Sequence, residues 1–312
     1  MSNDRARRDA RQRTLARRAG ISGIGLHCGL PVSMTLDPAP VDHGLVFLRK
    51  DTGQRVPATW EHAVESPLCT TLVDEQGGKI ATIEHLLSAL SALGVDNLLI
   101  TLDGPEAPVL DGSSVRYVAL IDQAGIVEQA APRRAIEILE PVEVIDGDRS
   151  ARLEPAKRLE MAFDIDFADP AIGQQRWEGP IDEALYRDEI AKARTFGLLA
   201  EVEMMRKAGL GRGGSLENAV VVNNGSIMNP EGLRYADEFV RHKVLDAIGD
   251  LALAGAPIQG RFIGDKAGHA LTLRLLRQLF ATPKAWRWVT PREEAKRGGA
   301  ARVTVRAAAQ RA

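Results

Sequence analysis

The stretch Phe239-Val-Arg-His-Lys-Val-Leu-Asp-Ala-Ile-Gly-Asp250 carries the strongest structural signal in the chain. At about 3.6 residues per turn, His242, Asp246 and Asp250 lie on one side of a helix, about 40° apart per step. Apolar residues cover most of the remaining circumference, which is typical of a buried helix. The sequence therefore predicts a buried helix that directs an imidazole and two carboxylates into an interior or a cleft.

A histidine and a carboxylate one turn apart can bind one metal ion. Buried carboxylates need a compensating charge, and a bound cation can supply it. His242 and Asp246 offer the nitrogen and oxygen ligands that zinc accepts. For an isolated His-x-x-x-Asp, a hydrogen-bonded pair without metal is the simpler explanation, so the pattern alone leaves both alternatives open.

A second segment, Thr82-Ile-Glu-His-Leu-Leu87, opens another predicted helix. The neighbours Glu84 and His85 point about 100° apart on a helix, so they serve adjacent but different directions. His85 would complete a His–His–Asp ligand set, and a catalytic zinc keeps its fourth position for water. Glu84 could take the proton of that water as it attacks a carbonyl. The alternative is a first-turn carboxylate that only stabilises the helix dipole.

A third histidine, His269, follows Gly268 at the predicted start of a helix. A cationic imidazole is unfavourable at a helix N-terminus unless an acid supports it, and Asp250 could be that acid. His269 would then be a protonated general acid for a leaving amine. A capping or surface histidine in a turn is the alternative that these residues leave open.

Composition is that of an ordinary globular protein with more than one domain. The 312 residues are 45% hydrophobic and carry a net charge of −2, which gives no general electrostatic basis for binding nucleic acid. Two cysteines, Cys28 and Cys69, do not make a disulfide framework, and no apolar run reaches the about 20 residues of a membrane span. We expect a cytoplasmic monomer without a nucleic-acid partner or stable membrane insertion. The arginine-rich start, up to Arg18, is expected to be a frayed terminus.

The segment Gly209-Leu-Gly-Arg-Gly-Gly214 has the spacing of a dinucleotide-binding motif. That motif requires a strand before it and a helix after it, so that the helix N-terminus faces the pyrophosphate. Here a predicted helix precedes and a predicted strand follows. The segment is therefore not expected to bind a nucleotide cofactor.

The two halves of the chain share one order of elements, and each ends helix–strand–helix. The first half is predicted to hold strands at 32–36, 44–49, 69–74 and 97–102 and helices at 82–93 and 115–123. The second is predicted to hold strands at 134–140, 142–146, 151–154, 160–167, 219–223 and 259–263 and helices at 181–193, 201–208, 237–253 and 270–280. This order predicts an α+β fold of two similar domains, each a mostly antiparallel sheet with two main helices. The expected division is 1–131, 132–290 and a disordered tail at 291–312.

Seven segments in order, which cover about residues 13 to 290, make the chain resemble a known family. They are Gly23-Ile-Gly-Leu-His-Cys-Gly29, Thr82-Ile-Glu-His-Leu86, Pro108-Val-Leu-Asp-Gly-Ser113, Ala193-Arg-Thr-Phe-Gly197, Gly213-Gly-Ser-Leu-Glu-Asn218, Val240-Arg-His-Lys-Val-Leu-Asp-Ala-Ile-Gly-Asp250 and Gly268-His-Ala270. The family resembled is the UDP-3-O-acyl-N-acetylglucosamine deacetylases of Gram-negative bacteria. The resemblance implies zinc-dependent hydrolysis of the N-acetyl group of UDP-3-O-(3-hydroxyacyl)-N-acetylglucosamine, an early committed step of lipid A biosynthesis. It also implies helices packed between two outer sheets.

The resemblance further implies a role for each candidate residue. Zinc would be bound by His85, His242 and Asp246; such ligands select poorly between zinc and iron(II), so iron(II) could occupy the same site in the cell. Glu84 would be the general base and His269 the general acid, with Asp250 behind it. Thr195 would stabilise the oxyanion. The UDP-linked acylated amino sugar would be bound by Phe196, Lys243 and His27 and, along a passage for its acyl chain, by Leu198, Leu199, Met204 and Leu210.

Two other functions stay open at this point. One is a zinc amidohydrolase with a different N-acyl sugar or peptide as substrate. The other is a non-catalytic protein that binds a nucleotide-sugar lipid or regulates a partner. Activity that does not depend on the 3-O-acyl chain would favour the first, and a protein without turnover would favour the second.

Overall fold

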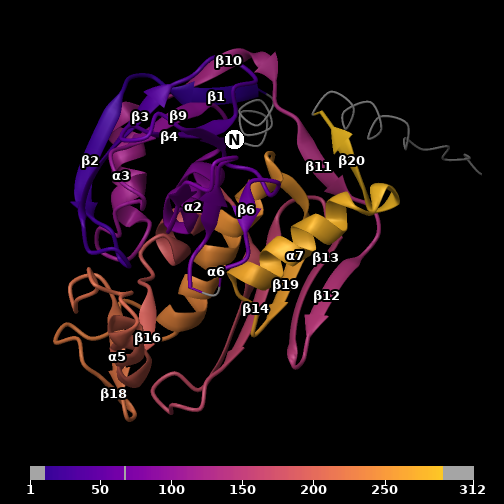
Figure 1. The fold of residues 1–312 in the computed structure, drawn as a ribbon. Helices are drawn as coiled ribbons and strands as arrows, with labels where there is room; N and C mark the ends of the chain where they lie inside the picture. The colour runs from indigo at the N-terminus through magenta and orange to yellow at the C-terminus, as the bar shows by residue number, and fades with distance from the viewer. Residues whose placement is uncertain (1–10, 67, 291–312) are drawn as a thin grey trace, which may run out of the picture.

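The computed structural model describes residues 11–66 and 68–290, and these form a mixed α+β fold (Figure 1). The predicted tail 291–312 lies outside the described residues, as does most of the arginine-rich start. Within the described part, no helix has the length and apolar character needed to cross a bilayer. The predicted α+β class is confirmed.

The first half is built on a five-stranded sheet in the order β2-β3-β9-β4-β5. Its central strand β9 pairs antiparallel with β3 and parallel with β4, and all other pairings are antiparallel. A separate small sheet, β6-β7-β8, is formed by the segment between β5 and β9. The strands are β2 (Ala19–Ile24), β3 (Pro31–Pro38), β4 (Leu45–Arg49), β5 (Arg55–Pro57), β6 (Ala63–Val64), β7 (Thr71–Val73), β8 (Lys79–Ile80) and β9 (Leu98–Leu102).

The second half is built on a seven-stranded sheet around β19. This strand pairs antiparallel with β13 and parallel with β11 and β14, as β9 pairs with strands of both directions in the first half. A separate sheet, β16-β17-β18, belongs to the segment before α6. The strands are β11 (Ala135–Ile138), β12 (Val142–Asp146), β13 (Arg149–Pro155), β14 (Glu160–Asp166), β15 (Gln174–Pro180), β16 (Phe196–Leu198), β17 (Val220–Asn223), β18 (Ser226–Ile227), β19 (Ile258–Asp265) and β20 (Trp286–Val289).

The main helices α2, α3, α6 and α7 lie between the two main sheets, with α2 and α6 in contact at the centre of the molecule, whereas α5 lies to one side with β16 and β18 (Figure 1). The helix–strand–helix order predicted for both halves is present as α2-β9-α3 and α6-β19-α7. The helical elements are α2 (Glu84–Leu93), α3 (Val115–Ala124), α4 (Glu183–Leu185), the π-helical turn η1 (Tyr186–Ile190), α5 (Leu199–Lys207), α6 (Glu238–Leu251), η2 (Ala252–Ala254), α7 (His269–Phe280) and η3 (Pro283–Ala285).

Helix α2 forms where the apolar spacing predicted it. Leu86, Leu87 and Leu90 are fully buried, and Gly94 ends the helix with a φ of 69°, a left-handed conformation that glycine adopts without strain. Its backbone N–H donates to the carbonyl of Ser91. Because α6 packs on the polar side, Glu84 is buried as well. Helix α2 is therefore buried over most of its length, its polar first turn included.

Two expectations for local structure are wrong. Arg11–Leu15 form strand β1, antiparallel to β10 (Ile126–Pro132), and Leu15 is buried, so this part of the start is not frayed. The helix predicted at 181–193 is limited to the short α4 and η1. The division into domains near residue 131, where β10 ends, stays a prediction.

Candidate active site

The candidate residues meet where the start of α2 contacts α6. Gly249 makes this contact possible, because a Cβ atom at its position would lie only 2.1 Å from the backbone oxygen of Glu84. Both helices can therefore direct side chains into the same small volume. Residues more than 150 positions apart in the sequence are brought together by one close backbone contact.

His85 from α2 joins His242 and Asp246 from α6 in a buried cluster. Their ligand atoms all lie within 4.8 Å of one another. Asp246 Oδ1 lies 3.6 Å from His85 Nε2 and 3.2 Å from His242 Nε2. The two imidazole rings are nearly perpendicular, with 5.0 Å between their centroids. The structure thus assembles the three residues that the sequence proposed as metal ligands.

The protonation of this cluster fits a divalent cation. Burial, together with the charge of His242, lowers the pKa of His85 to about 3, and burial also lowers the pKa of His242. His242 Nδ1 lies 3.1 Å from the carbonyl oxygen of Ala193, which accepts its proton and leaves the Nε2 lone pair facing the cluster. Burial would raise the pKa of Asp246, but the neighbouring cations outweigh it and hold this pKa below its ordinary value. Asp246 Oδ1 is buried without a hydrogen-bond partner, as expected of a metal ligand.

Glu84 lies beside the cluster and is placed to exchange a proton. Burial raises the pKa of its carboxyl to about 8. Its Oε2 accepts the backbone N–H of Thr70 at 3.0 Å, while its Oε1 lies 4.0 Å from His269 Nε2. A carboxylate with a pKa near neutrality can both take and release a proton, which suits a general base.

His269 and Asp250 form a buried ion pair beside both the cluster and Glu84. His269 Nδ1 lies 3.0 and 2.9 Å from the two oxygens of Asp250, and its Nε2 lies 4.0 Å from Asp246 Oδ2. Burial opposes the charged imidazolium, but Asp250 outweighs it and the pKa of His269 rises to about 10. A protonated Nε2 that faces the cluster has the geometry of a general acid. This arrangement differs from the surface histidine that the sequence left as an alternative.

Two residues predicted to bind substrate, Lys243 and Phe196, contact the cluster, and Thr195, predicted to stabilise the oxyanion, precedes Phe196 in the chain. Lys243 Nζ donates to Asp246 Oδ2 at 3.0 Å. The Phe196 ring centroid lies 6.3 Å from that of His242. Thr195 is half-buried, and its backbone N–H donates to Gly112 on the first half of the chain.

His27 lies in a turn that Glu106 holds. The Glu106 carboxylate accepts the backbone N–H of His27 at 2.8 Å and of Cys28 at 2.8 Å, and also the hydroxyl of Thr82 at 2.7 Å. Thr82 has a left-handed φ of 57° two residues before α2 begins. Glu106 therefore ties the turn that contains His27 to the start of the helix that contains Glu84.

The apolar residues predicted to line an acyl passage lie in the segment that holds β16 and α5. Leu198 and Leu199 are half-buried there. Met204 and Leu210 are 61% and 38% exposed. Their role in binding an acyl chain stays a prediction.

Three residues that organise the site were not singled out by the sequence: Thr70, Glu106 and Gly249. Thr70 and Glu106 act through hydrogen bonds that join distant segments, and no local periodicity reports such bonds. Gly249 carried a usable signal, because a glycine inside a long buried helix often marks a close packing contact.

Neutral imidazoles, an ionised carboxylate and a neighbouring base and acid are typical of metal-dependent hydrolases. Comparison with known proteins defines the family. The model of the UDP-3-O-acyl N-acetylglycosamine deacetylase family matches residues 12–281. The chain belongs to this family, which confirms the expectation from the seven sequence segments.

Relatives that carry the name UDP-3-O-acyl-N-acetylglucosamine deacetylase are similar over nearly their whole length. The protein of Phenylobacterium zucineum is 51% identical over 279 residues, which are 88% of this chain and 95% of the relative. The protein of Myxococcus xanthus is 46% identical over 289 residues, or 92% of each chain. The protein of Xanthomonas axonopodis pv. citri is 50% identical over 283 residues, or 89% of this chain and 93% of the relative.

Proposed function

We propose that this chain hydrolyses the N-acetyl group of UDP-3-O-(3-hydroxyacyl)-N-acetylglucosamine, with one zinc ion held by His85, His242 and Asp246. The buried cluster of these three side chains beside Glu84 carries the proposal. Two neutral imidazoles and one carboxylate are a ligand set that zinc accepts, and iron(II) is an alternative because such ligands select poorly between the two ions. Membership of the deacetylase family supplies the substrate class.

Glu84 and His269 carry out the two proton transfers of the proposed reaction. When bound, zinc supplies Lewis acidity, which polarises a carbonyl and lowers the pKa of a water molecule. Glu84 accepts a proton from the attacking water at Oε1. Thr195 donates a hydrogen bond to the developing oxyanion. His269 then donates its Nε2 proton to the amine as the carbon–nitrogen bond breaks, which yields acetate and the free amino sugar.

Substrate recognition is assigned to residues around this centre. The cation of Lys243 and the ring of Phe196 face the cluster and would contact the sugar or its nucleotide, and His27 lies on the turn fixed by Glu106. The acyl chain is assigned to a passage along Leu198, Leu199, Met204 and Leu210. The cytoplasmic location and the monomeric state expected from the sequence stay predictions.

Metal removal tests the proposal. Acetate release from the UDP-linked, 3-O-acylated substrate is measured before chelation, after chelation and after zinc is returned. Activity should disappear with the metal and return at about one zinc per chain. A matched Glu84→Gln variant should keep its zinc but lose roughly 100- to 10,000-fold in kcat. Full activity of the metal-free protein would refute the zinc mechanism, and equal activity without the 3-O-acyl chain would refute the assigned substrate.

A further inference from the structure

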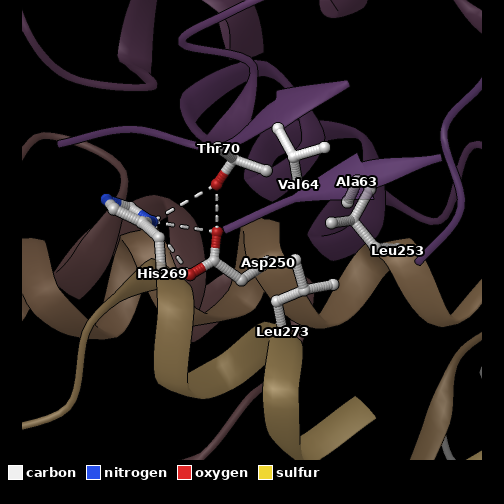
Figure 2. Close-up of a pocket in the computed structure, with 7 residues that line it drawn as sticks. All are labelled: Ala63, Val64, Thr70, Asp250, Leu253, His269 and Leu273. Atoms are coloured by element: carbon white, nitrogen blue, oxygen red, sulfur yellow. Dashed lines mark hydrogen bonds and ion pairs between the residues drawn. The ribbon is translucent and has the colours of Figure 1, made fainter. Parts of the chain in front are cut away.

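Thr70 lies in the connection before β7 and contacts both proton-transfer groups of the site. Its side chain faces Asp250 and His269, which come from α6 and α7 of the other half of the chain (Figure 2). The residue is only 5% exposed. The mechanism proposed above gives Thr70 no role as a zinc ligand, a base or an acid.

The hydroxyl of Thr70 completes a triangle with the ion pair. It donates a short hydrogen bond to Asp250 Oδ1, and its oxygen lies 3.3 Å from His269 Nδ1. His269 Nδ1 is itself within 3.0 Å of both Asp250 oxygens. A carboxylate held by a hydroxyl on one side has a restricted rotation, and a restricted carboxylate fixes the imidazole that it pairs with.

The backbone of Thr70 bonds the proposed base, Glu84. Its N–H donates to Glu84 Oε2 at 3.0 Å. Substitution of the side chain leaves this N–H in place, so the contribution of the hydroxyl can be separated from that of the backbone. One residue thus spans the distance between the base and the support of the acid.

Solvent has little room to replace the hydroxyl. The cavity that Thr70, Asp250 and His269 line is about 10 Å³, which is at the lower limit for a single water molecule. Its other walls are apolar: Ala63, Val64, Leu253 and Leu273 (Figure 2). Removal of the hydroxyl would therefore leave the facing oxygen of Asp250 without its hydroxyl donor and without a ready substitute.

We propose that Thr70 is a positioning residue whose hydroxyl fixes Asp250 and, through it, the direction of His269 Nε2. The assignment rests on the proposed function, because the acid role of His269 belongs to it. The hydroxyl of Thr70 bonds Asp250 and lies near His269 Nδ1, so it acts on the support of the acid and not on the Nε2 that would donate the proton. Its loss should therefore change the rate of proton donation and not the affinity for zinc or substrate.

Three variants test the assignment. Thr70→Val removes the hydroxyl at nearly constant volume and should lower kcat roughly 10- to 100-fold, the range for a hydrogen bond to a charged group. KM and zinc content should stay within about threefold of the wild type. Thr70→Ser keeps the hydroxyl and should restore most of kcat. The matched control is Thr71→Val, because Thr71 is similarly buried and its hydroxyl faces Cys69.

A double-mutant cycle with Asp250→Asn separates positioning from general damage. If Thr70 acts through Asp250, the double variant should lose much less activity than the product of the two single losses. Multiplicative losses, a Thr70→Val enzyme with unchanged kcat, or one that has lost its zinc would overturn the proposal. A wild-type chain that releases no acetate would instead refute the proposed function.

Discussion

The close contact between α2 and α6 can be tested by Gly249→Ala. A Cβ atom at this position would lie 2.1 Å from the Glu84 carbonyl oxygen and 2.8 Å from its carbonyl carbon. Ordinary contact begins at 3.4 Å, so the two helices would have to separate by about 1.3 Å. A displacement of about 1 Å at a catalytic site costs roughly 100-fold in rate. We expect that loss in kcat/KM, together with weaker zinc binding, since the ligands come from both helices.

The free energy of unfolding of the same variant is a second, independent test of the close contact. Alanine is the better helix former, so propensity alone would stabilise α6 by about 1 kcal/mol. Overpacking against backbone costs about 1–3 kcal/mol, and we expect this term to make the variant less stable in urea unfolding. Gly104→Ala is the matched control, because its Cβ would meet only Val32 at 3.6 Å. A Gly249→Ala protein that is more stable than wild type and fully active would refute the argument.

Two further variants test the electrostatics around the cluster. Arg194 is fully buried and its Nε donates to Glu238 at 2.9 Å, so Arg194→Met would leave Glu238 as an unpaired buried charge. This variant should lower the free energy of unfolding by about 3–5 kcal/mol. Urea unfolding unchanged from wild type would contradict this. In the metal-free protein, burial lowers the pKa of His85 to about 3 in the folded state, against an ordinary 6.5. The contribution of the neutral His85 to the free energy of unfolding is therefore complete above pH 6.5. As the pH falls below 6.5 this contribution is lost, by at most about 1.4 kcal/mol per pH unit. His85→Gln should lack that loss, and the same pH dependence in both proteins would exclude His85 as the cause.

Much of the centre of the fold could be predicted because it follows helical periodicity. Helix α6 was expected at 237–253 and is observed at Glu238–Leu251, and α2 was expected at 82–93 and is observed at Glu84–Leu93. Apolar side chains on nearly all faces of these helices carry the signal, so their ends and burial follow from local sequence. The presence of His85, His242 and Asp246 in one cluster could be proposed from ligand chemistry.

Other features depend on contacts that local sequence does not encode. Strand β15, Gln174–Pro180, is largely polar and was missed, because its pairing with β14 and not an apolar alternation makes it a strand. The arginine-rich start was expected to be frayed, yet Leu15 is buried where β1 pairs with β10. Thr70 was missed for the same reason, since its partner Asp250 lies 180 positions away.

The most direct test of the central claim is anomalous diffraction at the zinc edge from crystals of the zinc-loaded protein. We expect one strong peak within about 2.0–2.2 Å of His85 Nε2, His242 Nε2 and an oxygen of Asp246. The same crystals of an Asp246→Ala protein should show the peak strongly reduced. A zinc ion bound elsewhere, with these three side chains uncoordinated, would contradict the account.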